Sequence, residues 1–159
     1  MALTAVAVLF TDVVGSTELM SRVGEAVADE LRRDHFDRLR RVITANDGHE
    51  VKNLGDGLMV VFDSAASALS CAVGMQQALA AAPTGADRPE RIRIRIGVSF
   101  GEAEHEDDDY FGAPVVEAAR LCAAAGTDEI LLTDMVRLLV RSRGNFDLEP
   151  VGALDLKGL

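Results

Sequence analysis

The pattern of apolar and polar residues predicts a chain in which strands and helices alternate. Residues 3–10 are almost all apolar and of strand length, which favours a strand covered on at least one face. Residues 21–45 carry apolar side chains at helical spacing, with arginine and aspartate on the opposite side. Turn residues at 46–48 end this helix. His35 falls on the apolar stripe, and we interpret it as a packing residue, not a ligand.

The middle of the chain adds a hairpin, a second helix and a strand. Residues 50–54 and 58–62 are short runs joined by Gly-Asp-Gly, which predicts a β-hairpin with Asp56 at its tip. Ser64 then caps an alanine-rich helix that is predicted to extend to residue 82. Residues 91–100 alternate strictly between arginine and aliphatic side chains, which is the period of a strand. We interpret the three arginines as its solvent-exposed face, with a nucleotide-binding or subunit-contact role as the alternative.

The last third of the chain predicts smaller elements. Residues 102–109 are six acids in eight positions, for which we expect an exposed loop. The elements expected after it are a helix over residues 113–125, a short strand over 129–133, a short helix over 134–141 and two edge strands over 146–149 and 153–159.

The order of these elements indicates the fold class. Strand, helix, two strands, helix and strand is the βαββαβ order of a ferredoxin-like α+β sandwich, here with an additional C-terminal helix and short strands. We expect residues 1–159 to form one domain whose helices pack on one face of the sheet. We expect a partner subunit to cover the other face.

Charge and hydropathy argue against several partners. The net charge of −10 argues against a nucleic-acid backbone or an anionic membrane as the main partner. No apolar run approaches the roughly 20 residues that span a bilayer. The N-terminus lacks a signal-peptide pattern, and the two isolated cysteines suit reduced thiols. We predict a cytoplasmic protein with no nucleic-acid partner and no membrane partner within this chain.

Two aspartates stand where predicted strands end. Asp12 closes the first apolar run, and Gly15, Ser16 and Thr17 then open a helix, while Asp56 lies at the hairpin tip. A carboxylate beside the free N–H groups of a helix N-terminus can hold a divalent cation and a phosphate together. We therefore predict that Asp12 and Asp56 meet and share metal ions that carry a nucleotide.

Four motifs stand out along the chain. They are FTDVVGST at residues 10–17, KNLGDG at 52–57, DYFG at 109–112 with AARL at 118–121, and LKG at 156–158. Together they resemble the catalytic domain of class III nucleotidyl cyclases, and the resemblance covers essentially the whole chain. The short acidic segment between Gly101 and Tyr110 is similar to the bacterial subclass with a shortened dimerisation arm.

The resemblance implies a homodimer with two sites at its interface, each built from both subunits. One subunit would hold two divalent cations, Mg²⁺ or Mn²⁺, through Asp12, Asp56 and the backbone carbonyl of Val13. The backbone N–H groups from Val14 to Thr17 would hold the β- and γ-phosphates. The residues implied from the other subunit are the base-reading pair Lys52 and Asp109, the transition-state Arg120 and the triphosphate-binding Lys157.

The base-reading pair favours ATP as the substrate. Adenine offers an acceptor at N1 and a donor at its 6-amino group, which match an ammonium at Lys52 and a carboxylate at Asp109. Guanine has the reverse pattern, and a mismatched buried polar group costs about 1–3 kcal/mol. Asp108 takes the role of Asp109 if the register of the acidic run is shifted by one residue.

One position departs from the family pattern. The family usually has a ribose-orienting asparagine four residues before the arginine, where this chain has Val116. The loss of one such contact costs on the order of 2–4 kcal/mol, or a hundredfold or more in rate. We therefore expect a slow adenylate cyclase. The alternatives are a guanylate cyclase and a degenerate cyclase-like domain that binds a nucleotide or partner and only regulates.

Overall fold

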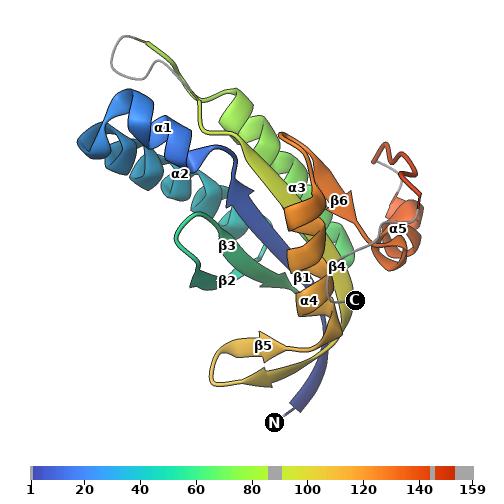
Figure 1. The fold of residues 1–159 in the computed structure, drawn as a ribbon. Helices are drawn as coiled ribbons and strands as arrows, with labels where there is room; N and C mark the ends of the chain where they lie inside the picture. The colour runs from blue at the N-terminus through green and yellow to red at the C-terminus, as the bar shows by residue number, and fades with distance from the viewer. Residues whose placement is uncertain (1, 86–90, 144–145, 153–159) are drawn as a thin grey trace.

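The chain folds into a sheet with helices on both of its faces (Figure 1). We describe it from a computed structural model, which describes residues 2–85, 91–143 and 146–152. The elements in chain order are β1 (Ala2–Val13), α1 (Ser16–Val23), α2 (Glu25–Ala45), β2 (His49–Asn53), β3 (Leu58–Phe62), α3 (Ala65–Ala80), β4 (Ile94–Glu106), β5 (Asp109–Phe111), α4 (Ala113–Ala124), β6 (Ile130–Leu132), α5 (Asp134–Val140) and a 3₁₀ turn (Arg141–Arg143).

The central strand of the sheet is β1. The strand order is β2-β3-β1-β4-β5, and β6 pairs in parallel with β4. Antiparallel pairing joins β1 to β3 on one side and to β4 on the other, the latter along the whole of β1. The four strands of the βαββαβ unit thus lie in the order of a ferredoxin-like sheet, which confirms the predicted fold class.

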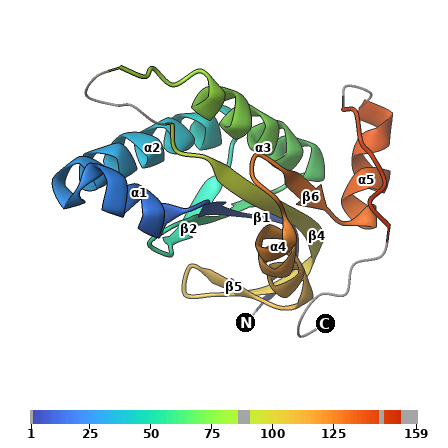
Figure 2. The same cartoon turned by 45° about the horizontal axis from the view of Figure 1, so that its top comes forward.

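Side chains of β1 alternate between two cores. Ala7 and Leu9 lie in the core beneath α2 and α3, while Val8 and Phe10 pack on the opposite face against Ala118 of α4. Figure 2 shows α2 and α3 on one side of the sheet and α4 on the other. The expectation of helices on one face only was therefore wrong. The second face of β1 is covered by α4 of the same chain, so a partner subunit is not needed to bury it.

The helix α4 lies unusually close to β4 because the strand presents small residues to it. A Cβ atom on Gly97 would lie 2.3 Å from the Ala118 carbonyl oxygen and 2.4 Å from the Cys122 backbone nitrogen. The two backbones are therefore in contact at this position. The buried Ser99 hydroxyl donates to the Pro114 carbonyl at 2.7 Å and fixes the start of the helix.

The first long helix is interrupted. Where one helix was predicted over residues 21–45, Gly24 adopts a φ of 86° and separates α1 from α2. Such a φ is open to glycine at no steric cost. The helix α3 begins as predicted, since the Ser64 hydroxyl accepts from the Ser67 backbone N–H.

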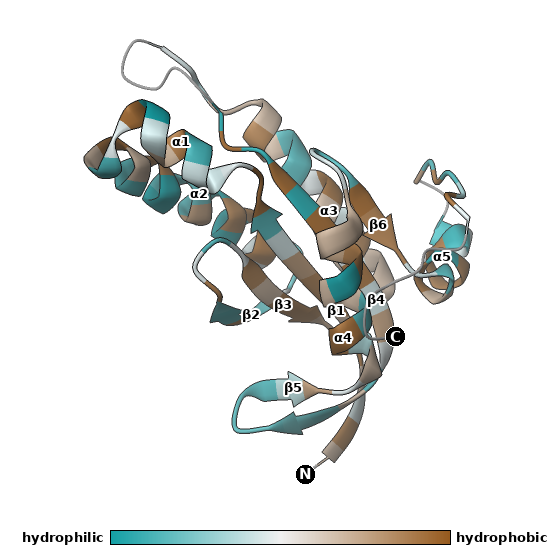
Figure 3. Cartoon of the chain, in the orientation of Figure 1, coloured by the Kyte–Doolittle hydropathy of each residue, from teal (hydrophilic) through white to brown (hydrophobic). Residues whose placement is uncertain are grey.

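The acidic segment at 102–109 is a hairpin and not the predicted loop. It belongs mostly to β4, which continues to Glu106 and turns through Asp107 and Asp108, at φ values of 52° and 61°, into β5. Aspartate is one of the few side chains that tolerate this left-handed conformation. Figure 3 shows the hydrophilic character of the hairpin around its turn. The acidic side chains therefore line a solvent-exposed β-arm.

The C-terminal segment differs from the expected pair of edge strands. Residues 146–149 form no strand, and Phe146 and Leu148 pack instead against the core beneath α3. The second expected strand, over 153–159, lies outside the described residues. No helix in the described part of the chain is long and apolar enough to cross a bilayer.

Candidate active site

Asp12 and Asp56 are brought together where β1 ends. The Val13 backbone N–H donates to the Asp56 carbonyl oxygen at 2.9 Å, and the Ser16 hydroxyl donates to Asp56 Oδ2 at 3.2 Å. These bonds fix the β2–β3 turn beside the C-terminal end of β1. Two acidic side chains 44 positions apart in the sequence thus share one edge of the molecule.

The carboxylate of Asp12 is already paired with an arginine. Arg95 donates to Asp12 Oδ2 from Nε at 3.0 Å and from Nη2 at 2.7 Å, and its Nη1 donates to the Ala123 carbonyl of α4 at 2.9 Å. The antiparallel register places Arg95 directly opposite Asp12. The interpretation of Arg91, Arg93 and Arg95 as a solvent-exposed face was wrong for Arg95, which is half-buried. The alternation of side chains predicts on which face of a strand a residue lies, but it does not predict which residue of the neighbouring strand stands opposite.

The donor set at this edge suits a hard divalent cation. Among the described residues, no group of three or more histidine, cysteine or acidic side chains is placed to hold a metal ion. Mg²⁺ is usually held by only one or two carboxylates, with water and substrate phosphates completing its shell. Asp12 and Asp56 supply such a pair, so the residues present fit a metal that arrives with a nucleotide.

The helix α1 begins directly after the carboxylate. Gly15 caps it with a φ of 66°, and its carbonyl accepts the first intrahelical bond from the Leu19 N–H at 2.9 Å. The first amides of a helix lack intrahelical acceptors and attract anions. Of the four predicted phosphate-binding residues, Val14 already donates its N–H to the Arg93 carbonyl at 2.8 Å. The backbone N–H groups that remain to bind phosphate at the start of the helix are those of Gly15, Ser16 and Thr17.

The predicted base-reading residues contact each other within one chain. Lys52 Nζ lies 3.0 Å from Asp109 Oδ2, and the Tyr110 N–H donates to Asp109 Oδ1 at 2.8 Å. Burial alone would raise the pKa of the Asp109 carboxyl, but the hydrogen bonds from Lys52 and Tyr110 outweigh it and lower that pKa. The pair joins β2 to β5, the strands at the two ends of the order β2-β3-β1-β4-β5. Asp108 lies in the turn of the arm, and Asp109 is the partner of Lys52.

The helix α4 presents Val116 and Arg120 to solvent. Ala118 and Cys122 face the sheet and are buried. Positions two residues away on a helix lie about 200° around its axis, so the side chains of Val116 and Arg120 point away from the sheet. Val116 is 38% exposed, and Arg120 forms no hydrogen bond or ion pair with the described part of the chain. Lys157 lies outside the described residues.

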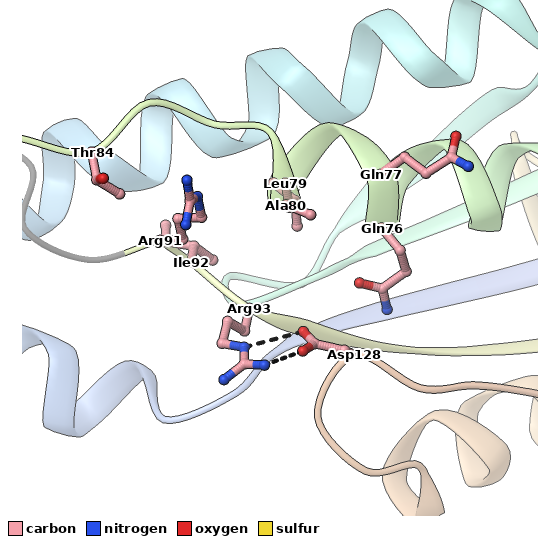
Figure 4. A pocket seen from close by; sticks show the side chains of 9 residues that line it. All are labelled: Gln76, Gln77, Leu79, Ala80, Thr84, Arg91, Ile92, Arg93 and Asp128. Atoms are coloured by element: carbon pink, nitrogen blue, oxygen red, sulfur yellow. Dashed lines mark hydrogen bonds and ion pairs between the residues drawn. The ribbon is translucent and has the colours of Figure 1, made fainter.

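A separate groove of about 750 Å³ lies between α3 and the start of β4 (Figure 4). It contains the ion pair between Arg93 and Asp128 but none of the predicted site residues. The candidate site therefore lies outside this groove. The groove is lined by Gln76, Gln77, Leu79, Ala80, Thr84, Arg91, Ile92, Arg93 and Asp128.

Comparison with known proteins identifies the family. The family model of the adenylate and guanylate cyclase catalytic domain matches residues 2–159. The chain belongs to this family. A Rhizobium meliloti protein with an adenylate cyclase name is 33% identical over 153 residues, which cover 96% of this chain and 26% of that protein. An adenylate cyclase of Streptomyces coelicolor is 33% identical over 138 residues, which cover 86% of this chain and 35% of that protein. The chain thus spans about a quarter to a third of these relatives.

Solved cyclase structures share the fold. The adenylate/guanylate cyclase/hydrolase of Silicibacter pomeroyi superposes with a TM-score of 0.82 at 33% identity, covering 99% of this chain and 92% of that chain. An adenylate cyclase structure from Trypanosoma brucei superposes with a TM-score of 0.86 at 22% identity, covering 98% and 85%. At that lower identity the likeness concerns the fold alone.

Proposed function

We propose that this domain is an adenylate cyclase that converts ATP to 3′,5′-cyclic AMP and pyrophosphate at a homodimer interface. The observation that carries the proposal is the meeting of Asp12 and Asp56 at the end of β1, in a chain of the cyclase family. Family membership supports a cyclase, and the positions of the other side chains support the choice of substrate and assembly.

The reaction requires the ribose 3′-hydroxyl to lose its proton and attack the α-phosphorus in line while pyrophosphate leaves. Two divalent cations, Mg²⁺ or Mn²⁺, lower the pKa of the attacking hydroxyl and neutralise the triphosphate when bound. Asp12, Asp56 and the Val13 carbonyl would hold them. Since Arg95 donates twice to Asp12 Oδ2, this ion pair has to open or share its carboxylate when a cation binds.

The pair of Lys52 and Asp109 supports ATP over GTP. In the free protein these side chains neutralise each other at 3.0 Å. Opened around a base, the ammonium would donate to adenine N1, and the carboxylate would accept from the 6-amino group. With guanine, the O6 acceptor would face the Asp109 carboxylate and the N1–H donor would face the Lys52 ammonium. Each such mismatched buried group costs about 1–3 kcal/mol.

The outward direction of Arg120 supports a shared site. A planar, permanently charged guanidinium is suited to charge that develops on an α-phosphate. Because Arg120 points away from its own sheet, it would act on a nucleotide held by the Asp12 and Asp56 of a second subunit. Val116, on the same face of α4, is 38% exposed, and Phe111 of β5 is 49% exposed, so both apolar side chains are available to a dimer contact.

The test is a nucleotide-cyclase assay of the purified domain. ATP and GTP are each supplied with Mn²⁺ or Mg²⁺, and cyclic nucleotide and pyrophosphate are both measured. Asp56→Ala should lose at least about a hundredfold in rate, whereas Asp29→Ala on the surface of α2 should retain the wild-type rate. Wild-type product no greater than that of Asp56→Ala would overturn the enzyme proposal. Faster turnover of GTP than of ATP would overturn the base-reading argument.

A second candidate function is favoured by Val116. A valine cannot hold the ribose by a hydrogen bond, so the domain could bind the nucleotide and serve only in regulation. This candidate predicts that ATP binds in the presence of Mn²⁺ while the assay yields no cyclic AMP above the Asp56→Ala control.

A further inference from the structure

The ladder between β1 and β3 stops just before the metal-binding edge. Its last register pair is Phe10 with Met59. At the next position, the Leu58 backbone N–H donates instead to the Thr11 side-chain hydroxyl at 3.0 Å. Thr11 is 3% exposed and Leu58 is fully buried, so water cannot replace this acceptor. A side chain thus supplies the hydrogen bond that the ladder lacks.

The same residue touches the turn that carries Asp56. A Cβ atom on Gly57 would lie 1.8 Å from the Thr11 carbonyl oxygen and 3.2 Å from the Asp12 Cα atom. The turn therefore lies backbone against backbone on β1. On the far side of Asp12, the Val13 N–H donates to the Asp56 carbonyl at 2.9 Å.

These contacts bracket both carboxylates. Thr11 and Val13 flank Asp12 on β1, and the groups that they hold, Leu58 N–H and the Asp56 carbonyl, flank Gly57 on the turn. The bond at Val13 uses backbone atoms and is independent of residue type. The hydrogen bond at Thr11 depends on one side-chain hydroxyl, so a substitution can remove it.

We propose that Thr11 is a positioning residue for the divalent cations, because its hydroxyl holds the Asp56 turn at a fixed separation from Asp12. The inference rests on the proposed function, which assigns the metal to these carboxylates. Mg²⁺ demands near-ideal geometry, and the loss of an outer-shell partner typically weakens metal affinity about 10–100-fold. Valine matches threonine in shape but offers no acceptor to Leu58, whereas serine keeps the hydroxyl.

The experiment measures Mn²⁺ binding directly. Free Mn²⁺ is followed by electron paramagnetic resonance while the metal is titrated into wild type, Thr11→Val, Thr11→Ser and Ser99→Ala, with and without 3′-deoxy-ATP, which lacks the attacking hydroxyl. Ser99→Ala removes another buried hydroxyl bond, to α4 and away from the carboxylates, and controls for a general loss of stability. All titrations are made below the melting temperature of each variant. Thr11→Ala, which removes the same hydroxyl without placing a methyl group in its position, replaces Thr11→Val if that protein does not fold.

We expect Thr11→Val to raise the dissociation constant for Mn²⁺ by about tenfold or more, with Thr11→Ser and Ser99→Ala close to wild type. Equal Mn²⁺ affinity in Thr11→Val and wild type would overturn the inference, as would equal weakening by Thr11→Val and Ser99→Ala. The proposed function fails differently: if Asp12→Ala and wild type bind Mn²⁺ alike, the carboxylates are not the metal site.

Discussion

The end of β1 and the outward face of α4 are organised in opposite ways. At the end of β1, Asp12 is held by Arg95, and Asp56 is held by Ser16 and by the Val13 backbone. On α4, Arg120 has no polar partner in the described part of the chain. Yet α4 itself is rigidly placed, backbone against backbone on β4. Because no described residue pairs with this guanidinium, it is available to a nucleotide held by a second subunit, as the proposed function requires.

The contrast separates two kinds of function within one chain. In the proposed function, binding of the metal and phosphates uses groups that one subunit brings together by itself, and stabilisation of the transition state uses a group that this subunit points outward. We infer that one chain alone should bind a metal–nucleotide complex, whereas only the dimer should cyclise it.

The largest effect is expected when two inactive variants, one altered in each region, are mixed. Asp12→Ala and Arg120→Ala should each lose at least about a hundredfold in rate, because one removes a metal ligand and the other the transition-state guanidinium. Their equimolar mixture should recover about a quarter of the wild-type rate, since half of the dimers are mixed and each keeps one intact site of two. The measurement is cyclic AMP formed after subunit exchange.

Two controls decide whether recovered activity in this mixture comes from a site shared between subunits. Asp12→Ala mixed with Asp56→Ala should stay inactive, because both lesions lie in the same half of the site. If differently tagged subunits are shown to form mixed dimers and the Asp12→Ala with Arg120→Ala mixture still makes no product, the site is not shared.

Much of this organisation could be predicted from sequence. The almost continuous apolar run of β1, the period-2 pattern of β4 and the turn chemistry around Asp56 are local signals, and the fold class follows from the order of the elements. The position of α4 could not be derived in the same way, because it depends on Gly97 and Ser99 facing a helix that follows in the chain. A glycine in a strand indicates close approach but does not say what approaches.

The ion pair of Arg95 with Asp12 was missed for a related reason. It depends on the register between two strands about 80 residues apart, and no local period encodes that register. The acidic arm was assigned to a loop because six charges suggest solvation. A hairpin with a two-residue turn through Asp107 and Asp108 also leaves these acidic side chains in contact with solvent.

A substitution on the outward face of α4 should increase activity. Val116→Asn restores a donor and acceptor one turn before Arg120 on the same exposed face, and should raise kcat about tenfold to a hundredfold with a smaller change in KM. Steady-state cyclic AMP formation measures it. Val116→Ala shortens the same side chain without adding a polar group and should not raise kcat. An unchanged kcat in Val116→Asn would show that the ribose is already oriented by another group.

The smallest effect concerns a buried histidine that belongs to neither region. His35 of α2 is 2% exposed, and neither ring nitrogen has a hydrogen-bond partner in the described part of the chain. Burial lowers its pKa from 6.5 to about 4, against the opposing influence of Asp34. The unfolded chain therefore takes up a proton at this site more readily than the folded chain as pH falls below 6.5. The contribution of His35 to stability is fully present above that pH and decreases by about 2 kcal/mol by pH 5.

His35→Leu isolates this contribution, because it keeps an apolar volume at the site and removes the titrating ring. Denaturant unfolding at pH 7.5 and pH 5 should show that the wild type loses about 2 kcal/mol more stability than the variant over this interval. Equal losses in both proteins would assign the acid sensitivity to other groups.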